Sequence, residues 1–131
     1  STWGGNLVDM VRCARYLQII HEENLVENAA EVGAHYKAGR EAMTQDFPYI
    51  TGVRGRGLFL AMDLPDGETR KRLRLGCWDR GLAALPCGPR SLRFRPPLCF
   101  TKENVDQALR TLRETLQSMP EPVNGGPEPS I

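Results

Sequence analysis

The amino-acid sequence predicts an α+β fold in which helices cover one face of a small, largely antiparallel sheet. In several long stretches, apolar residues recur every three or four positions, which is typical of helices. Short β-prone segments, bounded by turns with glycine and proline, lie between some of these stretches. The predicted order is helix, helix, strand, strand, helix, strand, strand, helix. That order is typical of helices packed on one side of an antiparallel sheet. A chain of 131 residues is long enough to form one such domain.

Two helices are predicted before any strand. The first begins after Gly4-Gly5, with Asn6 as its N-cap and an apolar stripe over residues 7–20. The second covers about residues 25–46, and Pro48 prevents its continuation.

A β-hairpin and a third helix are expected next. Residues 49–53 and 58–64 are β-prone, and residues 54–57, Arg-Gly-Arg-Gly, are expected to form the turn between them. The third helix is predicted over residues 68–80, with Gly81 ending it.

The last predicted elements are two short strands and a fourth helix. The strands are expected at residues 82–85 and 91–94, on either side of a turn at residues 86–90. Thr101 is the expected N-cap of the helix, whose apolar stripe ends at Met119.

Composition excludes several classes of protein. Seventeen Lys and Arg against sixteen Asp and Glu leave a net charge of +1, too small to suggest nucleic acid or an anionic membrane as partner. No apolar run approaches the ~20 residues of a membrane span and no signal peptide is evident, so a cytoplasmic location is expected. The cysteines form no CxxC pair, so we predict no metal site and no disulfide, and expect reduced, mostly buried thiols. They are Cys13, Cys77, Cys87 and Cys99.

The start of the chain contains the parts of a phosphate site. Thr2 offers a hydroxyl, and Gly4-Gly5 offer backbone N–H groups just before a helix N-terminus. From the residues alone, a plain helix cap and a glycine turn are the commoner explanation of this pattern.

Two arginines near the predicted last strand suggest a carboxylate site. Arg93 and Arg95 alternate with apolar residues, so in a strand both guanidinium groups lie on one face. A guanidinium group binds a carboxylate through two parallel hydrogen bonds. For isolated arginines a solvated strand face is the commoner case.

Three ordered motifs resemble one family of enzymes. Residues 1–12, STWGGNLVDMVR, closely resemble a segment of L-lysine 6-aminotransferases, which are fold-type I, class-III aminotransferases related to ornithine and 4-aminobutyrate aminotransferases. The likeness continues through residues 54–58 and through residues 92–98, LRFRPPL, in the family's order and spacing. It implies that residues 1–119 correspond to the C-terminal domain of such an enzyme. Residues 120–131 are rich in Pro, Gly and Glu, and this composition predicts a disordered tail.

The resemblance also implies an activity. Such enzymes are homodimers that use pyridoxal 5'-phosphate to transfer the 6-amino group of L-lysine to 2-oxoglutarate, giving 2-aminoadipate 6-semialdehyde and L-glutamate in lysine catabolism. By resemblance, residues 1–20 form a phosphate-contact segment and a linking helix, and Thr2 contacts the cofactor phosphate of the neighbouring subunit. The position of Arg93 matches the arginine that binds the substrate α-carboxylate.

No catalytic residue is assigned within the chain. In the family, the lysine that binds the cofactor covalently precedes the Ser-Thr-aromatic-Gly-Gly run, so it is expected upstream of Ser1. Lys37, Lys71 and Lys102 are expected to be solvated surface charges. The chain alone is therefore expected to be inactive.

Two alternatives stay open at this point. A 4-aminobutyrate or ornithine aminotransferase is possible within the same enzyme class, although the residues at positions 3–10 favour lysine. A free-standing module that binds an amino acid without chemistry belongs to another class.

The other candidate residues are expected to have no role in binding. Arg95 is expected only to support Arg93, and Arg56 is expected to lie at an exposed hairpin tip. His21 and His35 are expected at the surface or at helix ends.

Overall fold

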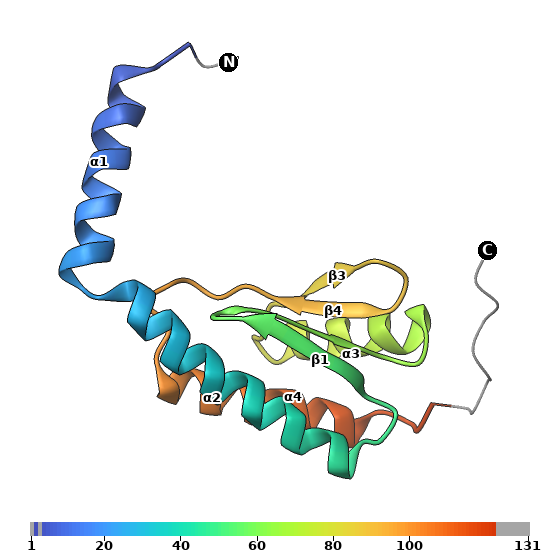
Figure 1. Ribbon diagram of the computed structural model, residues 1–131. Helices are drawn as coiled ribbons and strands as arrows, with labels where there is room; N and C mark the ends of the chain where they lie inside the picture. Colours follow the sequence, from blue (N-terminus) through green and yellow to red (C-terminus); the bar gives the residue numbers. More distant parts are fainter. Residues whose placement is uncertain (1, 3, 123–131) are drawn as a thin grey trace.

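The computed structural model describes residue 2 and residues 4–122 (Figure 1). Most of the predicted tail, from residue 123 onward, lies outside the described residues. The order of elements is the predicted one. The helices are α1 (Leu7–Glu22), α2 (Leu25–Asp46), α3 (Gly67–Asp79) and α4 (Lys102–Ser118). The strands are β1 (Thr51–Arg56), β2 (Phe59–Asp63), β3 (Leu85–Cys87) and β4 (Ser91–Phe94).

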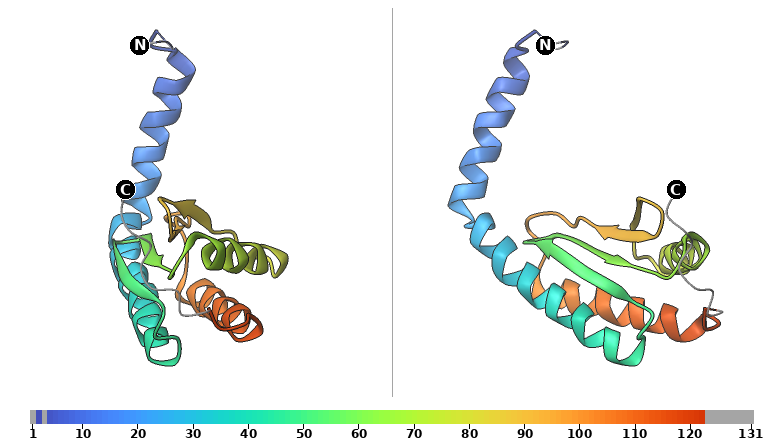
Figure 2. Two further views of the ribbon diagram at one scale, coloured as in Figure 1. Left: turned by 90° about the vertical axis from the view of Figure 1, so that its right-hand side faces the viewer. Right: turned by 45° about the vertical axis from the view of Figure 1, so that its right-hand side comes forward.

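The strands form one sheet in the order β1-β2-β4-β3, and every neighbouring pair is antiparallel. Directly paired residues of antiparallel strands point to the same face. Leu60 pairs with Phe94 and Met62 with Leu92, and all four side chains are buried. Figure 2 shows α2 and α4 side by side beneath this face. The predicted α+β class, with helices on one face of the sheet, is confirmed.

The hairpin is confirmed, but its predicted turn is wrong. Arg54-Gly55-Arg56 belongs to β1, and only residues 57 and 58 form the turn. A side chain at Gly55 would place its Cβ 2.2 Å from the carbonyl oxygen of Phe59 on the paired strand. The glycine therefore permits close pairing of two strands where the sequence suggested a loop.

The third strand also lies later than predicted, at Leu85–Cys87 in place of residues 82–85. It contains Pro86, which the sequence analysis assigned to a turn. Proline lacks a backbone N–H, but β3 is the outer strand of the sheet, where that loss is tolerated.

Polar side chains cap three helix starts, and two of these caps, Asn6 and Thr101, were predicted. Asn6 accepts a hydrogen bond from the backbone N–H of Val8 at 2.9 Å. Thr101 and Asn104 bond reciprocally at the start of α4. Asp66 accepts from the N–H of Thr69 at 2.7 Å, so α3 begins one residue before its predicted start.

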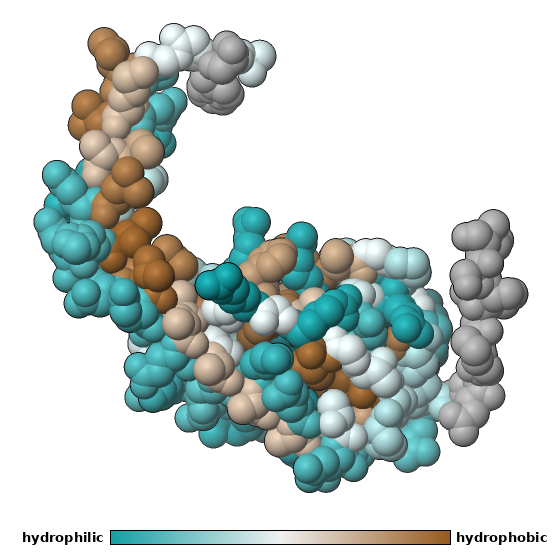
Figure 3. All heavy atoms as spheres, in the orientation of Figure 1, coloured by the Kyte–Doolittle hydropathy of each residue, from teal (hydrophilic) through white to brown (hydrophobic). Residues whose placement is uncertain are grey.

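Helix α1 departs from the packed body. It has the predicted apolar stripe but no buried residue, and Figures 1 and 3 show it projecting away with apolar side chains along its length. Its most exposed large apolar side chains are Leu7, Val8, Val11 and Leu17, each at least 63% exposed. Within the part of the chain that the structure describes, this stripe has no partner surface.

Two further expectations were tested. Cys77 is buried in the core, whereas Cys13, Cys87 and Cys99 are exposed, so the prediction of mostly buried thiols is wrong. The prediction rested on the usual burial of free cysteines. Cys13 instead lies on α1, which has no buried residue, Cys87 lies on the exposed strand β3, and Cys99 lies in a turn. Among the described residues, no helix combines the length and apolarity needed to cross a membrane.

Candidate functional site

Arg93 lies at the centre of β4 on the sheet face that the helices leave open. It is paired with Ala61 of β2 and with Leu85 of β3, which share that face. Its guanidinium carbon is 5.9 Å from the centre of the Phe59 ring. Its Nε is buried and has no hydrogen-bond partner among the described residues. Arg93 is thus held among apolar neighbours with bonding capacity left for a ligand.

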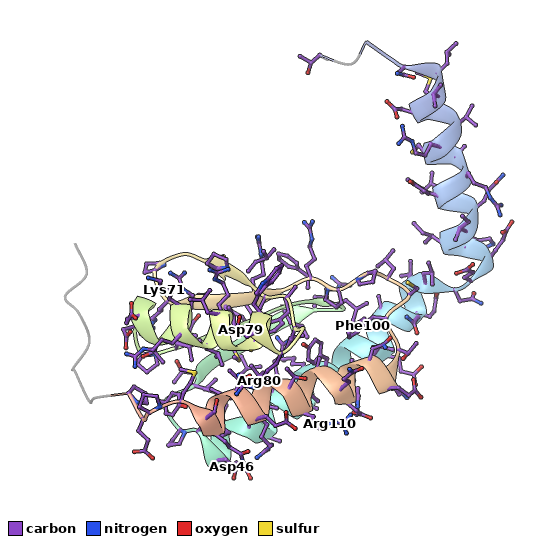
Figure 4. All side chains as sticks on the ribbon, turned by 180° about the vertical axis from the view of Figure 1, so that it is seen from behind. Asp46, Lys71, Asp79, Arg80, Phe100 and Arg110 are labelled. Atoms are coloured by element: carbon purple, nitrogen blue, oxygen red, sulfur yellow. The ribbon has the colours of Figure 1, made fainter. Side chains whose placement is uncertain are left out.

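A pocket of about 400 Å³ lies beside Arg93. Its wall is mostly apolar and comes from α2, from the segment before β3, and from the chain that follows β4. Its apolar members include Tyr36, Leu82, Leu85, Phe94, Pro97 and Phe100. Figure 4 labels Phe100, which directly precedes the cap of α4. Arg95 lines the same pocket but is exposed, so the structure brings both predicted arginines to one site.

Thr2, Gly4 and Gly5 lie at the free end of α1 (Figure 1). Thr2 is exposed, so its hydroxyl is accessible. Gly4 and Gly5 have φ values of +56° and +76°, and a Cβ on Gly4 would meet no atom within 4 Å. An accessible hydroxyl and an open glycine turn before a helix N-terminus fit a phosphate group. Trp3 lies outside the described residues.

The two predicted sites are not adjacent within one chain. Thr2 precedes α1, and the pocket of Arg93 lies in the body that follows this helix. The 16 residues of α1 correspond to a length of about 24 Å. If both sites serve one active centre, they belong to different copies of the chain.

A polar cluster on the open face was missed by the sequence analysis. Asp63 accepts hydrogen bonds from Arg54 at 2.9 Å and from the Ser91 hydroxyl at 2.5 Å. Burial alone would raise the pKa of Asp63, but these two hydrogen bonds and the positive charges of Arg54 and Arg90 together outweigh it, so the pKa is lowered. Asp63 and Ser91 are cross-strand partners, a relation that becomes visible only once the strand order is known. The Arg54 of the Arg-Gly-Arg-Gly motif is therefore a structural residue.

The remaining candidates lie on the surface, as predicted. Lys37 is 3.4 Å from Glu41, and Lys71 is exposed on α3 (Figure 4). Lys102 lies 2.5 Å from Glu31, and this hydrogen bond raises the pKa of Lys102. A raised pKa keeps an amine protonated and unreactive.

The other predicted surface residues are also exposed. His21 lies in the last turn of α1, and His35 is 2.7 Å from Asp106. Arg56 is exposed at the end of β1, although the observed turn of the hairpin begins one residue further on than the predicted tip. Among the described residues, no group of three or more potential ligands could hold a metal ion.

Comparison with known proteins identifies the family. Residues 1–116 match the family model for class-III aminotransferases. The chain belongs to the class-III aminotransferase family. It is 46% identical to an L-lysine-epsilon aminotransferase of Amycolatopsis lactamdurans over 90% of this chain and 27% of that protein. The chain thus spans about a quarter of the length of the curated relatives it matches.

Solved structures agree with this assignment. The fold matches a lysine aminotransferase from M. tuberculosis with a TM-score of 0.85 and 41% identity, covering 89% of this chain and 27% of that one. Identity is lower outside the lysine enzymes. A probable mitochondrial 4-aminobutyrate aminotransferase of Caenorhabditis elegans is 33% identical over 91% of this chain and 25% of that protein.

Proposed function

We propose that this chain is the C-terminal part of a pyridoxal-phosphate-dependent L-lysine 6-aminotransferase. The full enzyme transfers the 6-amino group of L-lysine to 2-oxoglutarate, giving 2-aminoadipate 6-semialdehyde and L-glutamate. Family membership supports an aminotransferase over a free-standing binding module. Identity of 46% to a lysine enzyme against 33% to a 4-aminobutyrate enzyme supports lysine as the donor.

The position and surroundings of Arg93 carry this proposal. Its Nε is buried without a partner among the described residues, and apolar side chains border the adjoining pocket. 2-Oxoglutarate carries an α-carboxylate next to its reacting carbon, and a guanidinium group binds such a carboxylate in a single orientation through paired hydrogen bonds. The apolar surroundings weaken competition from water and strengthen the ionic contact. Arg93 therefore binds the α-carboxylate and fixes the orientation of the rest of the substrate.

Thr2, Gly4 and Gly5 would hold the cofactor phosphate. The exposed Thr2 hydroxyl donates a hydrogen bond, and the glycine turn leaves room for the phosphate oxygens. Bound pyridoxal phosphate supplies an electron sink for the bond changes at the amino-bearing carbon. Because α1 separates Thr2 from Arg93, we infer that Thr2 serves the neighbouring subunit of a homodimer. The exposed apolar stripe of α1 fits a helix that is covered in such an assembly. The cytoplasmic location stays a prediction.

The donor specificity tests this proposal directly. Purified full-length enzyme loaded with pyridoxal phosphate would receive 2-oxoglutarate and one of three donors: L-lysine, L-ornithine or 4-aminobutyrate. Glutamate formation measured over time should give the highest kcat/KM for L-lysine. Higher kcat/KM for another donor would reassign the substrate. Binding of an amino acid without any glutamate formation would support the non-enzymatic module.

A further inference from the structure

The core of the domain contains a charged residue that the sequence analysis did not single out. Arg40 of α2 is 0% exposed and is the largest fully buried side chain. Its guanidinium carbon lies 3.8 Å from the centre of the Tyr36 ring and 3.7 Å from that of Phe94. None of its three side-chain nitrogens has a hydrogen-bond partner among the described residues.

No anion among the described residues neutralises this guanidinium group. The ionisable side chains that influence it are Tyr36 and Cys77. Burial raises the pKa of Tyr36 and the pKa of Cys77, so both stay uncharged near neutral pH. Burial also lowers the pKa of Arg40, but an arginine keeps its proton in proteins. Buried charges are ordinarily paired, and contact with two aromatic faces offsets only part of the cost of burial.

The two rings that hold Arg40 also belong to the wall of the Arg93 pocket. Tyr36 and Phe94 line this pocket, and their ring centres are 6.0 Å apart in an edge-to-face arrangement. Phe94 is also the neighbour of Arg93 in β4, and their side chains point to opposite faces. The aromatic wall therefore has an unpaired cation on its core side and the predicted carboxylate site on its other side.

We propose that Arg40 is a positioning residue of the carboxylate site. Its unneutralised charge favours a carboxylate bound on the other side of the aromatic wall, and its contacts with Tyr36 and Phe94 support the two rings of that wall. This inference rests on the proposed function of Arg93. In a dry interior a charge is poorly screened, so its influence extends beyond direct contact. At an effective dielectric constant of about 20, one uncompensated charge roughly 10 Å from a bound carboxylate changes the affinity of the site for that carboxylate about tenfold.

A role in packing alone predicts a different outcome. Replacing a buried, unpaired charge by an apolar side chain of similar volume is often neutral or stabilising. The proposal therefore predicts that removing the charge weakens carboxylate binding without lowering the melting temperature. If Arg40 served only to fill the core, replacing it with a side chain of similar volume would leave carboxylate affinity unchanged.

The test uses full-length enzyme loaded with pyridoxal phosphate, with 2-oxoglutarate as the carboxylate probe. Arg40→Met should raise KM for 2-oxoglutarate about tenfold. Its kcat should stay within about twofold of the wild type, because the cation does not touch the reacting atoms. Its Tm should equal or exceed that of the wild type. Arg40→Gln, a polar neutral variant, should raise KM similarly, which keeps the test valid if Arg40→Met fails to fold.

Two controls separate the possible causes. Leu112→Val loosens the same core without changing charge, so it should lower Tm and leave KM unchanged. Arg93→Ala tests the proposed function itself, and a normal KM there would refute the carboxylate site whatever Arg40 does. With Arg93 shown to bind the carboxylate, an unchanged KM in both Arg40 variants would overturn the present inference. A matching rise of KM in Leu112→Val would also overturn it.

Discussion

The two faces of the sheet are built from alternate residues of the same strands, yet they differ in chemistry. On the covered face, Leu92 and Phe94 are buried against helices. On the open face, Arg93 keeps a buried Nε without a partner among the described residues, and Asp63 carries a charge. The covered face thus stabilises the fold, and the open face presents groups that can bind. Substitutions on the two faces should accordingly affect different measurements.

The largest expected effect tests the covered side. Leu73 and Leu75 lie on the same helix, but Leu73 is 0% exposed and Leu75 is 42% exposed. Leu73→Ala should lower the free energy of unfolding by about 2–5 kcal/mol, because it leaves a cavity in the core. Leu75→Ala is the matched control and should cost less than about 1 kcal/mol. Urea unfolding of the 131-residue chain, followed by circular dichroism, measures both. Equal losses would show that α3 is not packed as described.

The next effect tests the open side. In the full-length enzyme, Arg93→Ala should lower kcat/KM for 2-oxoglutarate by at least roughly thirtyfold, since losing one partner of a buried charge pair costs about 2–5 kcal/mol. Arg93→Lys should restore little, because an ammonium group lacks the planar fork. Steady-state kinetics decides this once folding and cofactor content are shown to be normal.

Arg95 provides the matched control for Arg93. It lines the same pocket but is exposed and lies beyond the end of β4. Arg95→Ala should reduce kcat/KM much less than Arg93→Ala. A larger loss in Arg95→Ala, or near-normal kinetics in Arg93→Ala, would assign carboxylate binding to the other arginine.

The contrast between the faces was only partly predictable from the sequence. Alternation correctly placed Arg93 opposite the buried Leu92 and Phe94, because side chains in a strand alternate strictly. The register of β3 was not predictable, since proline usually marks a turn and only the strand's outer position makes Pro86 tolerable. Strand order, which brings Asp63 beside Ser91, is a long-range property that local patterns do not contain.

The helices, too, were only partly predictable from the sequence. The stripe of α2 was predicted, and Arg40 lies on it four residues after Tyr36 and three before Met43. The spacing therefore already placed a charge in the core, although an arginine is normally assigned to the surface. In α1, periodicity correctly predicted an amphipathic helix but could not show what covers its apolar side. A hydrophobic stripe indicates a partner surface without identifying it.

A third prediction concerns the end of α1, a region that neither face of the sheet contacts in the described chain. Thr2→Ala in the full-length enzyme removes a hydrogen bond to a charged phosphate, which should cost about 1.5–3 kcal/mol of cofactor affinity. That corresponds to a rise of about ten- to a hundredfold in the dissociation constant for pyridoxal phosphate. Equilibrium dialysis measures the constant, and size-exclusion chromatography should show an unchanged dimer. Thr2→Ser keeps the hydroxyl and is the matched control. Unchanged cofactor affinity in Thr2→Ala would leave Thr2 as a helix-start residue.

The smallest expected effect is that of removing the charge of Asp63. It sharpens the comparison between the two faces of the sheet, because Asp63 lies on the open face but has a structural role. Its hydrogen bonds from Ser91 and Arg54 favour the charged carboxylate and lower its pKa below the unfolded value. The stabilisation is therefore complete above the unfolded pKa of about 4 and is lost as the pH falls through the lower folded pKa. Asp63→Asn should cost about 1 kcal/mol at pH 7, a modest value because the Arg54 side chain is 51% exposed.

Urea unfolding of the wild-type 131-residue chain and of Asp63→Asn at pH 7, pH 5 and pH 3 would show whether this difference disappears with acid. Asp46 pairs with Arg113 at an exposed site, so Asp46→Asn is the matched control and should change stability by less than about 0.5 kcal/mol. A difference between wild type and Asp63→Asn that stays constant down to pH 3 would mean that the charge of Asp63 does not stabilise the sheet. The open face would then carry only groups for binding, and the division between the two faces would be sharper than the hydrogen bonds of Asp63 indicate.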